Sequence, residues 1–415
     1  MRSIARVAFF YPESLMHQPA QKPSPPSELQ ASPGVRSLAI GSIGFLTLVD
    51  LFAAQAILPQ LMHLYRVGPT QIGLAVNAST LGMAVAGPIA AGAVRGLSRR
   101  AGIWVSLALL AAPTALLAIA PTLLSFTLLR VLQGVFMASA FTLTLAHFAE
   151  RCSKHDMPRA LAAYVTGSVL ANLLGRLIAS NVAEEFGAPA AFLALTALNL
   201  SGALLAFVTL THVAPLPLRV EARELVAVFA RHLRNPALRR AYAVGFLILF
   251  GFVGLFSYVG FALAAPAGEL SMKAAGLAFL CFAPSLATTP LAGPLSARLG
   301  TATAAAFALL SAVIGAFLSL AANIPVILLG MALFSSGAFV AQAVVTSFVG
   351  RAAKFERAAA SGLYLSAYYS GGLAGAAAIG ALYEKFGWSG AASGVAISLA
   401  LASLLAAGLV ENASA

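Results

Sequence analysis

The chain has 415 residues, of which 60% are hydrophobic and only 9% are charged, and its formal net charge is +12. Soluble domains carry charge on roughly 25% of their residues. A water-exposed surface this poor in charge is therefore excluded, and we expect most of the chain to lie in lipid. The basic residues fall in short runs between apolar segments rather than along one groove or helix face. This pattern argues against nucleic-acid binding and makes the lipid bilayer the expected partner.

The start of the chain differs in composition from the rest. Residues 1–36 are rich in Pro, Ser and Gln, and their only apolar run, VAFF, is too short for a signal peptide. We interpret them as a disordered cytoplasmic tail or an over-extended start. The two cysteines, Cys152 and Cys281, lie in a basic loop and in an apolar segment. They form neither a disulfide framework nor a metal-ligand motif, so no metal site is expected.

Apolar segments long enough to cross a bilayer follow this tail. A membrane helix needs about 20 apolar residues, and the segments are delimited by charges, prolines and glycines. The sequence therefore predicts an all-α membrane protein. Its twelve predicted spans are residues 37–62, 70–94, 101–120, 122–149, 158–183, 188–212, 241–265, 271–297, 301–322, 325–349, 358–383 and 388–410.

The distribution of Lys and Arg predicts the orientation of these spans. Cytoplasmic loops carry an excess of both residues. If the N-terminus is cytoplasmic, only Arg66, Lys273 and Lys385 of the 25 basic residues lie in outside loops or at the outer ends of spans, and only Arg130 and Arg176 lie deep inside spans. The opposite orientation would reverse this bias. Both termini are therefore predicted to be cytoplasmic.

The longest loop between spans divides them six and six. Within residues 213–240, Leu225, Val228, Phe229 and Leu233 lie at helical spacing opposite charged positions. This spacing predicts an amphipathic helix along the cytoplasmic face. The predicted units are a bundle at 37–212, the linker at 213–240, a second bundle at 241–410 and a cytoplasmic tail at 411–415.

The two halves resemble each other at an offset of 200 residues. The segment EEFG at 184–187 meets EKFG at 384–387, and matching basic residues precede both segments. Agreement of charged and glycine positions at one offset indicates a duplication. Two six-helix halves related by pseudo-symmetry are an architecture in which a binding site lies between the halves. The matched pairs are Arg151 with Arg351, Lys154 with Lys354, Gly175 with Gly375, and Glu184 with Glu384.

Several motifs resemble those of the major facilitator superfamily. GPLSARLG at 293–300 is similar to its loop signature, with Ala297 at the acid position, and GPIAAGAVRGLSRRAG from Gly87 is a stretched first-half copy. LLRVLQGVFMASA at 128–140 and GSVLANLLGRLIAS at 167–180 resemble signatures of the drug:proton antiporter branch. The second of these has Gly175 and Arg176 where Gly-Pro is usual. YLSAYYSGGLAG and FSYVGFAL further resemble bacterial efflux permeases.

This resemblance implies twelve transmembrane helices in two pseudo-symmetric six-helix bundles in the bacterial inner membrane. It further implies a monomeric transporter that exports a small molecule by proton antiport and alternating access, without a cofactor and driven by the proton gradient. The residues that it assigns to conformational motifs are Gly87, Arg99, Arg100, Gly134, Gly175, Gly293, Arg298 and Gly300.

Asp50 is the acid that lies inside a predicted span. It is about 14 residues, or ~21 Å, from the cytoplasmic end of the first span, and Arg130 of the fourth span lies at a similar depth. The resemblance implies that both helices line the central cavity. An ionised carboxylate in hydrocarbon needs a partner or water. Asp50 and Arg130 are therefore expected to couple proton binding to transport; a static buried pair, or backbone capping by Asp50, is the alternative.

Further polar and aromatic residues in the spans are candidates for substrate binding. Arg176 could contact an anionic group or reach toward the membrane surface. Tyr364 and Tyr368 share a helix face and lie too deep for an interfacial belt, so they could line a cavity or only pack beside glycines. The amides could equally hold helices together. The full set of substrate-binding candidates is Gln133, Asn172, Arg176, Tyr258, Gln342, Tyr364 and Tyr368.

Three other functions compete with proton antiport. An uncoupled facilitator and a proton symporter for a small solute are close alternatives. A membrane-embedded enzyme would need a nucleophile with its base, or metal ligands, and the sequence shows neither these nor an ATP-binding loop. We therefore expect a transporter rather than an enzyme.

Overall fold

The computed structural model describes residues 33–93, 98–152, 157–210, 222–263, 278–353 and 355–409. These residues form helices and connecting turns without any strand. Residues 1–32 and 410–415, which cover most of the two expected tails, lie outside the described residues. The same holds for Lys154, Lys273 and Lys354.

The N-terminal half consists of the first six spans. Its first span is built from three elements, because the helix α1 gives way to a 3₁₀ turn, η2, before the short helix α2. The elements are α1 (Pro33–Ala53), η2 (Ala54–Ile57), α2 (Leu58–Tyr65), α3 (Pro69–Ala93), α4 (Arg99–Leu117), α5 (Leu123–Arg151), α6 (Met157–Phe186) and α7 (Ala188–Thr209).

The C-terminal half follows the linker helix α8. Its eighth span is broken into short helices, and its last helix, α15, contains two of the predicted spans. The elements are α8 (Ala222–Arg234), α9 (Pro236–Leu263), η4 (Ala278–Phe282), α11 (Ala283–Thr288), η5 (Thr289–Leu291), α12 (Ala292–Leu299), α13 (Thr301–Leu318), α14 (Ile324–Ala352) and α15 (Arg357–Ala406).

The helices confirm the predicted all-α membrane architecture. Within the described ranges, 11 helices are long and apolar enough to cross a membrane. One of them, α15, turns at Gly387, whose φ of 65° and ψ of −158° are not helical. It therefore accounts for two spans, and every predicted span has a helical counterpart.

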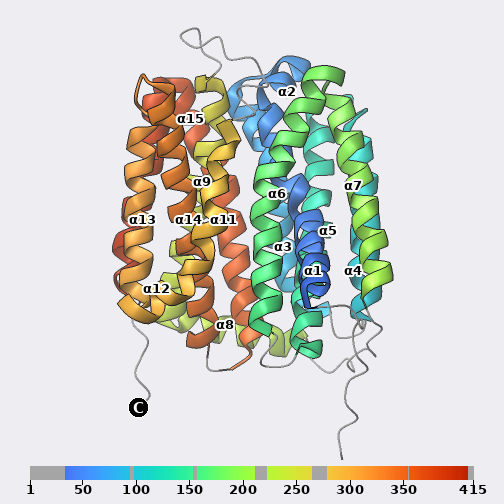
Figure 1. Ribbon diagram of the computed structural model, residues 1–415, viewed down its shortest axis with the longest axis vertical. Helices are drawn as coiled ribbons and strands as arrows, with labels where there is room; N and C mark the ends of the chain where they lie inside the picture. Colours follow the sequence, from blue (N-terminus) through green and yellow to red (C-terminus); the bar gives the residue numbers. More distant parts are fainter. Residues whose placement is uncertain are drawn as a thin grey trace, which may run out of the picture.

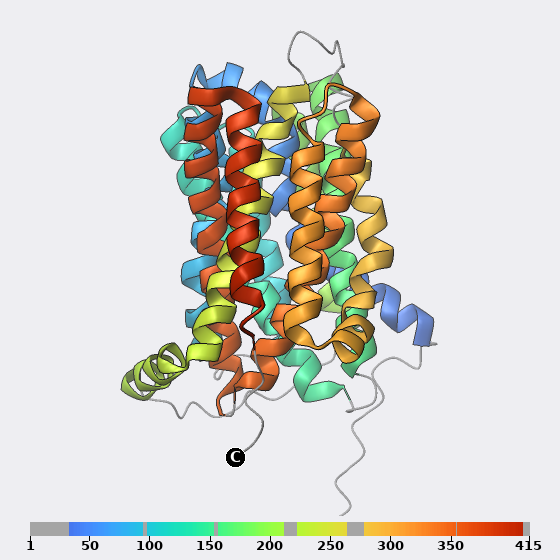
Figure 2. The same cartoon turned by 90° about the vertical axis from the view of Figure 1, so that its left-hand side faces the viewer.

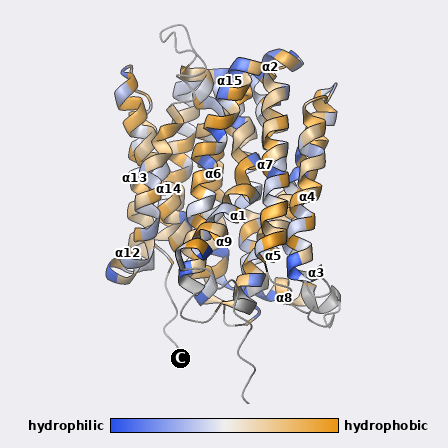
Figure 3. Ribbon diagram, turned by 45° about the vertical axis from the view of Figure 1, so that its right-hand side comes forward, coloured by the Kyte–Doolittle hydropathy of each residue, from blue (hydrophilic) through white to orange (hydrophobic). Residues whose placement is uncertain are grey.

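The long helices run side by side in two groups, α1–α7 and α9–α15 (Figure 1), and the view turned by 90° shows the same alignment (Figure 2). The short helix α2 lies at one end of the molecule and α8 at the other; we call these the α2 end and the α8 end. Apolar residues cover most of the long helices, and hydrophilic residues are prominent near the two ends (Figure 3). Large apolar side chains such as Leu204, Ile397 and Leu404 are exposed on the spans. This surface fits contact with lipid.

The duplication extends to the backbone. Gly187 ends α6 with φ 85°, and Gly387 ends the first part of α15 with φ 65°. Positive φ favours glycine, which has no Cβ. EEFG and EKFG therefore end the two matching helices with the same kind of turn.

Side-chain packing repeats in the two halves as well. The Tyr164 ring of α6 lies against Gly44 of α1, and the Tyr364 ring of α15 lies against Gly245 of α9. In both pairs a glycine on the first helix of a half makes room for a tyrosine on the fifth. The two halves are thus assembled by the same helix contacts.

The predicted amphipathic linker helix is α8. Its His232 is buried and stacks on Phe355 with 4.5 Å between ring centroids. Val226 and Leu233 are 65% and 49% exposed. α8 therefore has one side against the protein and one apolar exposed side. Leu233 lies on the same helix face as Phe229, as expected from their spacing of four residues, but it is exposed whereas Phe229 is partly buried.

The seventh span begins earlier than expected. α9 starts at Pro236 rather than at residue 241. The Asn235 side-chain oxygen accepts hydrogen bonds from the backbone N–H groups of Ala237, at 3.0 Å, and Leu238, at 3.4 Å. Asparagine and proline at these positions are favourable at a helix start. The linker is therefore shorter than 213–240.

The glycine contacts between spans predict a stability effect. A Cβ on Gly375 would collide with the Phe250 carbonyl of α9, whereas a Cβ on Gly260 of α9 would meet nothing within 4 Å. Gly375→Ala should force α15 away from α9 and destabilise the protein by about 1–3 kcal/mol. Thermal unfolding in detergent should show a lower midpoint for Gly375→Ala than for the control Gly260→Ala. Equal midpoints would contradict this packing.

Candidate functional site

The first span is broken toward its α2 end. Pro59 has no N–H group, and its ring clashes with the carbonyl four residues earlier, so the α-helix does not continue through η2. The end of an α-helix leaves carbonyl oxygens without partners. Here, Arg130 Nη1 donates to the Asp50 carbonyl at 3.0 Å and Nη2 donates to the Leu51 carbonyl at 3.3 Å. Arg130 of α5 therefore supports the break in α1.

The remaining donors of Arg130 are used as well. Nε donates to the Val76 carbonyl of α3 at 2.7 Å, and Nη2 donates to the Ser79 hydroxyl at 2.9 Å. Nη1 also donates to Gln133 Oε1 at 2.7 Å. The side chain is only 1% exposed. One guanidinium thus joins α1, α3 and α5 in the interior of the N-terminal half.

The Asp50 carboxyl is buried but not hydrogen-bonded. The residue is 1% exposed, and neither carboxyl oxygen has a hydrogen-bond partner among the described residues. Its polar neighbours are Arg130 and Asn199 of α7. The amides of Asn199 and Gln133 both donate to the Thr114 hydroxyl, at 3.0 and 2.6 Å. We call Asp50, Arg130, Gln133, Thr114 and Asn199 the acid cluster.

The acid cluster does not face the contact between the halves. A pocket of about 550 Å³ runs along α1 and α6. On α1, the pocket residues Leu38 and Phe45 lie on one helix face. Leu48 and Phe52 extend this face, because they follow at spacings of three and four residues. Asp50 is two residues before Phe52, about 200° around the helix. The structure thus brings Asp50 and Arg130 together. They lie on the side of α1 that faces away from the pocket, whereas we expected them to line it. The pocket is lined by Gly34, Ser37, Leu38, Gly41, Ser42, Phe45, Ala163, Thr166, Gly167, Leu170 and Leu174.

A second polar chain connects the two halves. Arg176 Nη2 of α6 donates to Gln55 Oε1 in η2 at 2.5 Å, and Gln55 Nε2 donates to Asn77 Oδ1 of α3 at 2.5 Å. Asn77 Nδ2 donates in turn to the Ser257 hydroxyl of α9 at 3.0 Å. These four side chains are buried. The chain passes through the break in α1, because Gln55 is part of η2.

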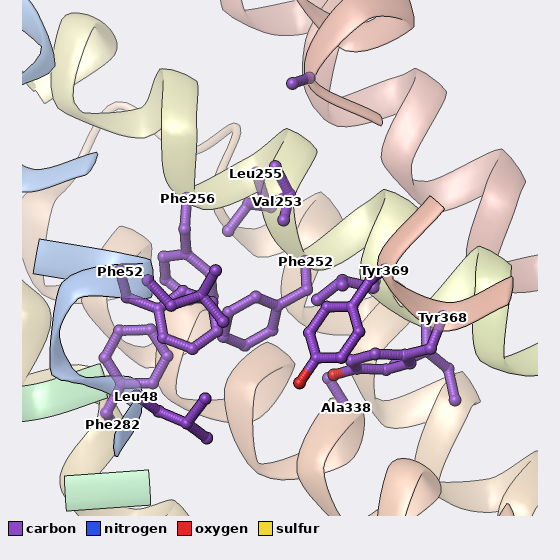
Figure 4. Close-up of a cluster of buried hydrophobic side chains, with 14 of the residues drawn as sticks. Leu48, Phe52, Phe252, Val253, Leu255, Phe256, Phe282, Ala338, Tyr368 and Tyr369 are labelled. Carbon is purple, nitrogen blue, oxygen red and sulfur yellow. The ribbon is translucent and has the colours of Figure 1, made fainter. Parts of the chain in front are cut away.

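Four phenyl rings surround the Arg176 guanidinium. Its central carbon lies 5.6 Å from the Phe52 ring centre, 5.1 Å from Phe256, 4.7 Å from Phe279 and 5.0 Å from Phe282. Phe52 belongs to the N-terminal half, and the other three belong to the C-terminal half. Figure 4 shows Phe52, Phe256 and Phe282 packed together between the halves. We call Arg176 and these four rings the arginine cage.

The other candidates for substrate binding lie apart from the cage. The Tyr258 hydroxyl donates to the Ala376 carbonyl at 2.6 Å and lies against Gly73 of α3, so this ring packs where the two halves meet. Tyr364 packs on α9, whereas Tyr368 stacks on Tyr364 at 6.1 Å and meets Tyr369 edge-to-face at 5.3 Å between ring centroids. Tyr368 and Tyr369 point into the aromatic layer of Figure 4.

The two remaining amide candidates are held differently. Asn172 is buried on α6, where its Nδ2 donates to the Ser168 carbonyl at 3.4 Å and its Oδ1 has no partner. Gln342 is half-buried on α14. Neither belongs to the acid cluster or to the arginine cage.

The residues assigned to conformational motifs fall into two structural groups. The close-contact group allows helices to approach, as at Gly134 against the Ser79 carbonyl and Gly175 against Val49. Arg100 belongs to this group because it donates to the Phe207 carbonyl of α7 at 2.6 Å, and Arg99 is buried beside it. The other group has no close neighbour or is exposed: Gly87, Gly293, Arg298 and Gly300, of which Gly300 ends α12 with φ 81°.

The sequence did not single out several residues of the acid cluster, the arginine cage and the polar chain between the halves. Gln55, Asn77, Thr114 and Asn199 are polar residues in apolar spans, which is a signal for interhelical hydrogen bonds. The cage rings carry no such signal, since Phe residues are abundant in this chain, with 26 in total. Only the packing of the halves shows which rings surround Arg176.

Known proteins share this architecture. The model of the family described as Major Facilitator Superfamily matches residues 40–268. The chain is 28% identical over 373 residues to the inner membrane transport protein YnfM of Escherichia coli (strain K12), covering 89% of each chain. It is 26% identical over 381 residues to the uncharacterized MFS-type transporter YybF of Bacillus subtilis (strain 168), covering 91% of this chain and 93% of that protein.

Solved structures agree at the level of the fold. The human organic anion transporter MFSD10 (TETRAN) superposes with a TM-score of 0.68 at 21% identity, covering 91% of this chain and 100% of that chain. A bacterial homolog of the human lysosomal transporter Spinster, in an inward-facing and occupied conformation, superposes with a TM-score of 0.67 at 15% identity, covering 91% of this chain and 96% of that one. Since the family model spans more than half of the sequence, this chain belongs to the Major Facilitator Superfamily of membrane transporters.

Proposed function

We propose that this transporter exports small organic molecules in exchange for protons, with Asp50 as the group that carries the proton. The observation behind the proposal is the Asp50 carboxyl, which is 1% exposed and has no hydrogen bond on either oxygen. A carboxyl held in a static ion pair or capping the backbone would have such bonds.

The burial of this carboxyl supports a protonated state in the conformation seen here. An ionised carboxylate without hydrogen bonds is costly in hydrocarbon, at roughly 2.5–3.5 kcal/mol even on the lenient insertion scale. We infer that Asp50 holds a proton in this conformation. It would release the proton when movement of α1 or α7 admits water to the acid cluster.

Arg130 connects the protonation state of Asp50 with the shape of the first span. In this structure its donors hold the carbonyl groups of Asp50, Leu51 and Val76 rather than the Asp50 carboxyl. Loss of the proton would create a carboxylate that competes for the guanidinium, because a pair of opposite full charges attracts more strongly than a charged donor attracts a neutral carbonyl group. The break in α1 would then lose part of its support and could change its angle.

The contacts between the halves support a conformation that is open at the α8 end. η4 and α11 pack against α6 on the side of the arginine cage, whereas α12 packs on α13 and α14; α3 and α15 also pack together, as where the Ser366 hydroxyl donates to the Ala84 carbonyl. The pocket along α1 and α6 is lined by residues of the N-terminal half alone. The α8 end carries Arg231, Arg234, Arg239 and Arg240, so we assign it to the cytoplasm. The bacterial inner membrane is the proposed location.

These assignments give a consistent cycle. Protons taken up from outside would stabilise the conformation open to the cytoplasm, and substrate entering the pocket would follow release of the proton. The deprotonated, loaded form would then open at the α2 end. The pocket walls are almost entirely apolar, which suits organic molecules rather than sugars or inorganic ions.

Replacing Asp50 tests the coupling. Asp50→Asn keeps the shape of the side chain but cannot carry the proton, so pH-driven flux in proteoliposomes should be abolished while exchange of substrate across the membrane is retained. A panel of organic compounds with an imposed pH gradient provides the measurement. Glu184→Gln, near the end of α6, is the control and should behave as the unmodified protein. Undiminished pH-driven flux in Asp50→Asn would show an uncoupled facilitator or a different proton carrier.

Replacing Arg130 tests its support of the break in α1. A lysine in its place keeps the charge but cannot reach five acceptors on three helices, so Arg130→Lys should leave buried groups unpaired and destabilise the protein by about 2–5 kcal/mol. Thermal unfolding should show a markedly lower midpoint than for Arg100→Lys, where a single carbonyl is contacted at the end of α4. Equal midpoints for the two variants would contradict this role of Arg130.

A further inference from the structure

Arg176 carries a buried charge that its surroundings do not neutralise. The side chain is 0% exposed, and its Nε and Nη1 atoms have no hydrogen-bond partner, while Nη2 contacts only the neutral amide of Gln55. A buried cation without an anionic partner is unfavourable by several kcal/mol. An ionisable residue kept at such a position within a membrane protein points to a functional site.

The phenyl rings offset only part of this cost. A cation near an aromatic face gains roughly 0.5–2 kcal/mol, and rings cannot accept the strong hydrogen bonds that Nε and Nη1 offer. An anionic group can both neutralise the charge and accept these hydrogen bonds. The cage therefore combines one positive charge and two open donors with flat apolar walls.

The cage lies at the contact that must open for transport. Phe256, Phe279 and Phe282 come from the C-terminal half, and Arg176 and Phe52 come from the N-terminal half. Separation of the halves would uncover the guanidinium. Phe52 also continues, through Leu48, the α1 face on which Phe45 lines the pocket, so the cage lies further along the same face.

We propose that the arginine cage binds the charged group of an organic monoanion whose body is aromatic or otherwise apolar. One guanidinium matches a single negative charge, and the rings and the pocket match an apolar body rather than a hydrated ion. Arg176 would contact the carboxylate or an equivalent group, and Phe52 would swing aside or stack on the body. This inference rests on the proposed transport of small organic molecules but not on its coupling to protons.

Binding of a simple aromatic acid tests the site. We would add benzoate, its neutral isostere benzamide, or acetate to the purified full-length protein and measure the shift of the thermal unfolding midpoint against concentration. Benzoate should bind at least about tenfold more tightly than benzamide or acetate. Arg176→Gln should lose at least about tenfold in benzoate affinity. Arg240→Gln, at the α8 end, should bind as the unmodified protein.

Two further variants keep the test decisive if Arg176→Gln does not fold. Arg176→Lys retains the charge and should keep weakened benzoate binding, whereas Phe279→Leu retains the arginine and should weaken benzoate more than acetate. Benzamide binding as tightly as benzoate, or unchanged benzoate affinity in the Arg176 variants, would overturn the anion site. Acetate binding as tightly as benzoate would overturn the claim that the site recognises an apolar body.

The outcome is separable from that of proton coupling. Benzoate binding is measured at equilibrium without a gradient, so it does not require pH-driven flux. Benzoate binding without pH-driven flux would refute the proposed antiport and support the cage. Flux of other compounds that is pH-driven, unaffected by Arg176→Gln and accompanied by no benzoate binding would refute the cage alone.

Discussion

The hydrogen bonds at the break in α1 hold the N-terminal half together. Peptide groups in hydrocarbon must find partners within the protein, and the break leaves carbonyl groups that a continuous helix would have used. Arg130 of α5 donates a hydrogen bond to one of these carbonyl groups, that of Asp50. Gln55, inside the break, contacts both Arg176 and Asn77. The acid cluster and the hydrogen-bonded chain from Arg176 to Ser257 therefore meet at one short segment. A change in the position of this segment would alter the contacts of both.

The duplicated halves share their packing but not their chemistry. Glycine contacts and terminal turns repeat between them, as at Gly44 with Tyr164 and Gly245 with Tyr364. The buried Asp and Arg residues, in contrast, all lie in the N-terminal half; within the described part of the C-terminal half no Asp, Glu, Lys or Arg is buried. That half instead presents phenyl rings to Arg176. Charge on one side and aromatic rings on the other suit a contact that closes without a permanent ion pair.

Much of the fold could be predicted from the sequence because its signals are local. Apolar length defines the spans, and the match of EEFG with EKFG reveals the duplication. The pairing of Asp50 with Arg130 follows from their similar depth. The direction of Asp50 could not be predicted, because depth does not tell which side of α1 faces the other half; only the apolar face of Leu48 and Phe52 settles it.

The arginine cage was harder to predict for a related reason. Arg176 stands out as a charge in an apolar span, but its rings come from three elements in two halves, and no spacing in the sequence connects them. Tyr364 was open to two interpretations, a cavity wall or packing beside glycines. Gly245 on the neighbouring helix gives its ring a place to pack.

The central claim is that protonation of Asp50 favours the conformation open at the α8 end. Spin labels at the exposed positions Ala162 on α6 and Ala297 on α12 would report the distance between the halves at that end by pulsed electron paramagnetic resonance. The account predicts that this distance becomes shorter as the pH is raised, and that in the Asp50→Asn protein it is the same at every pH. The same pH-dependent shortening in Asp50→Asn would contradict it.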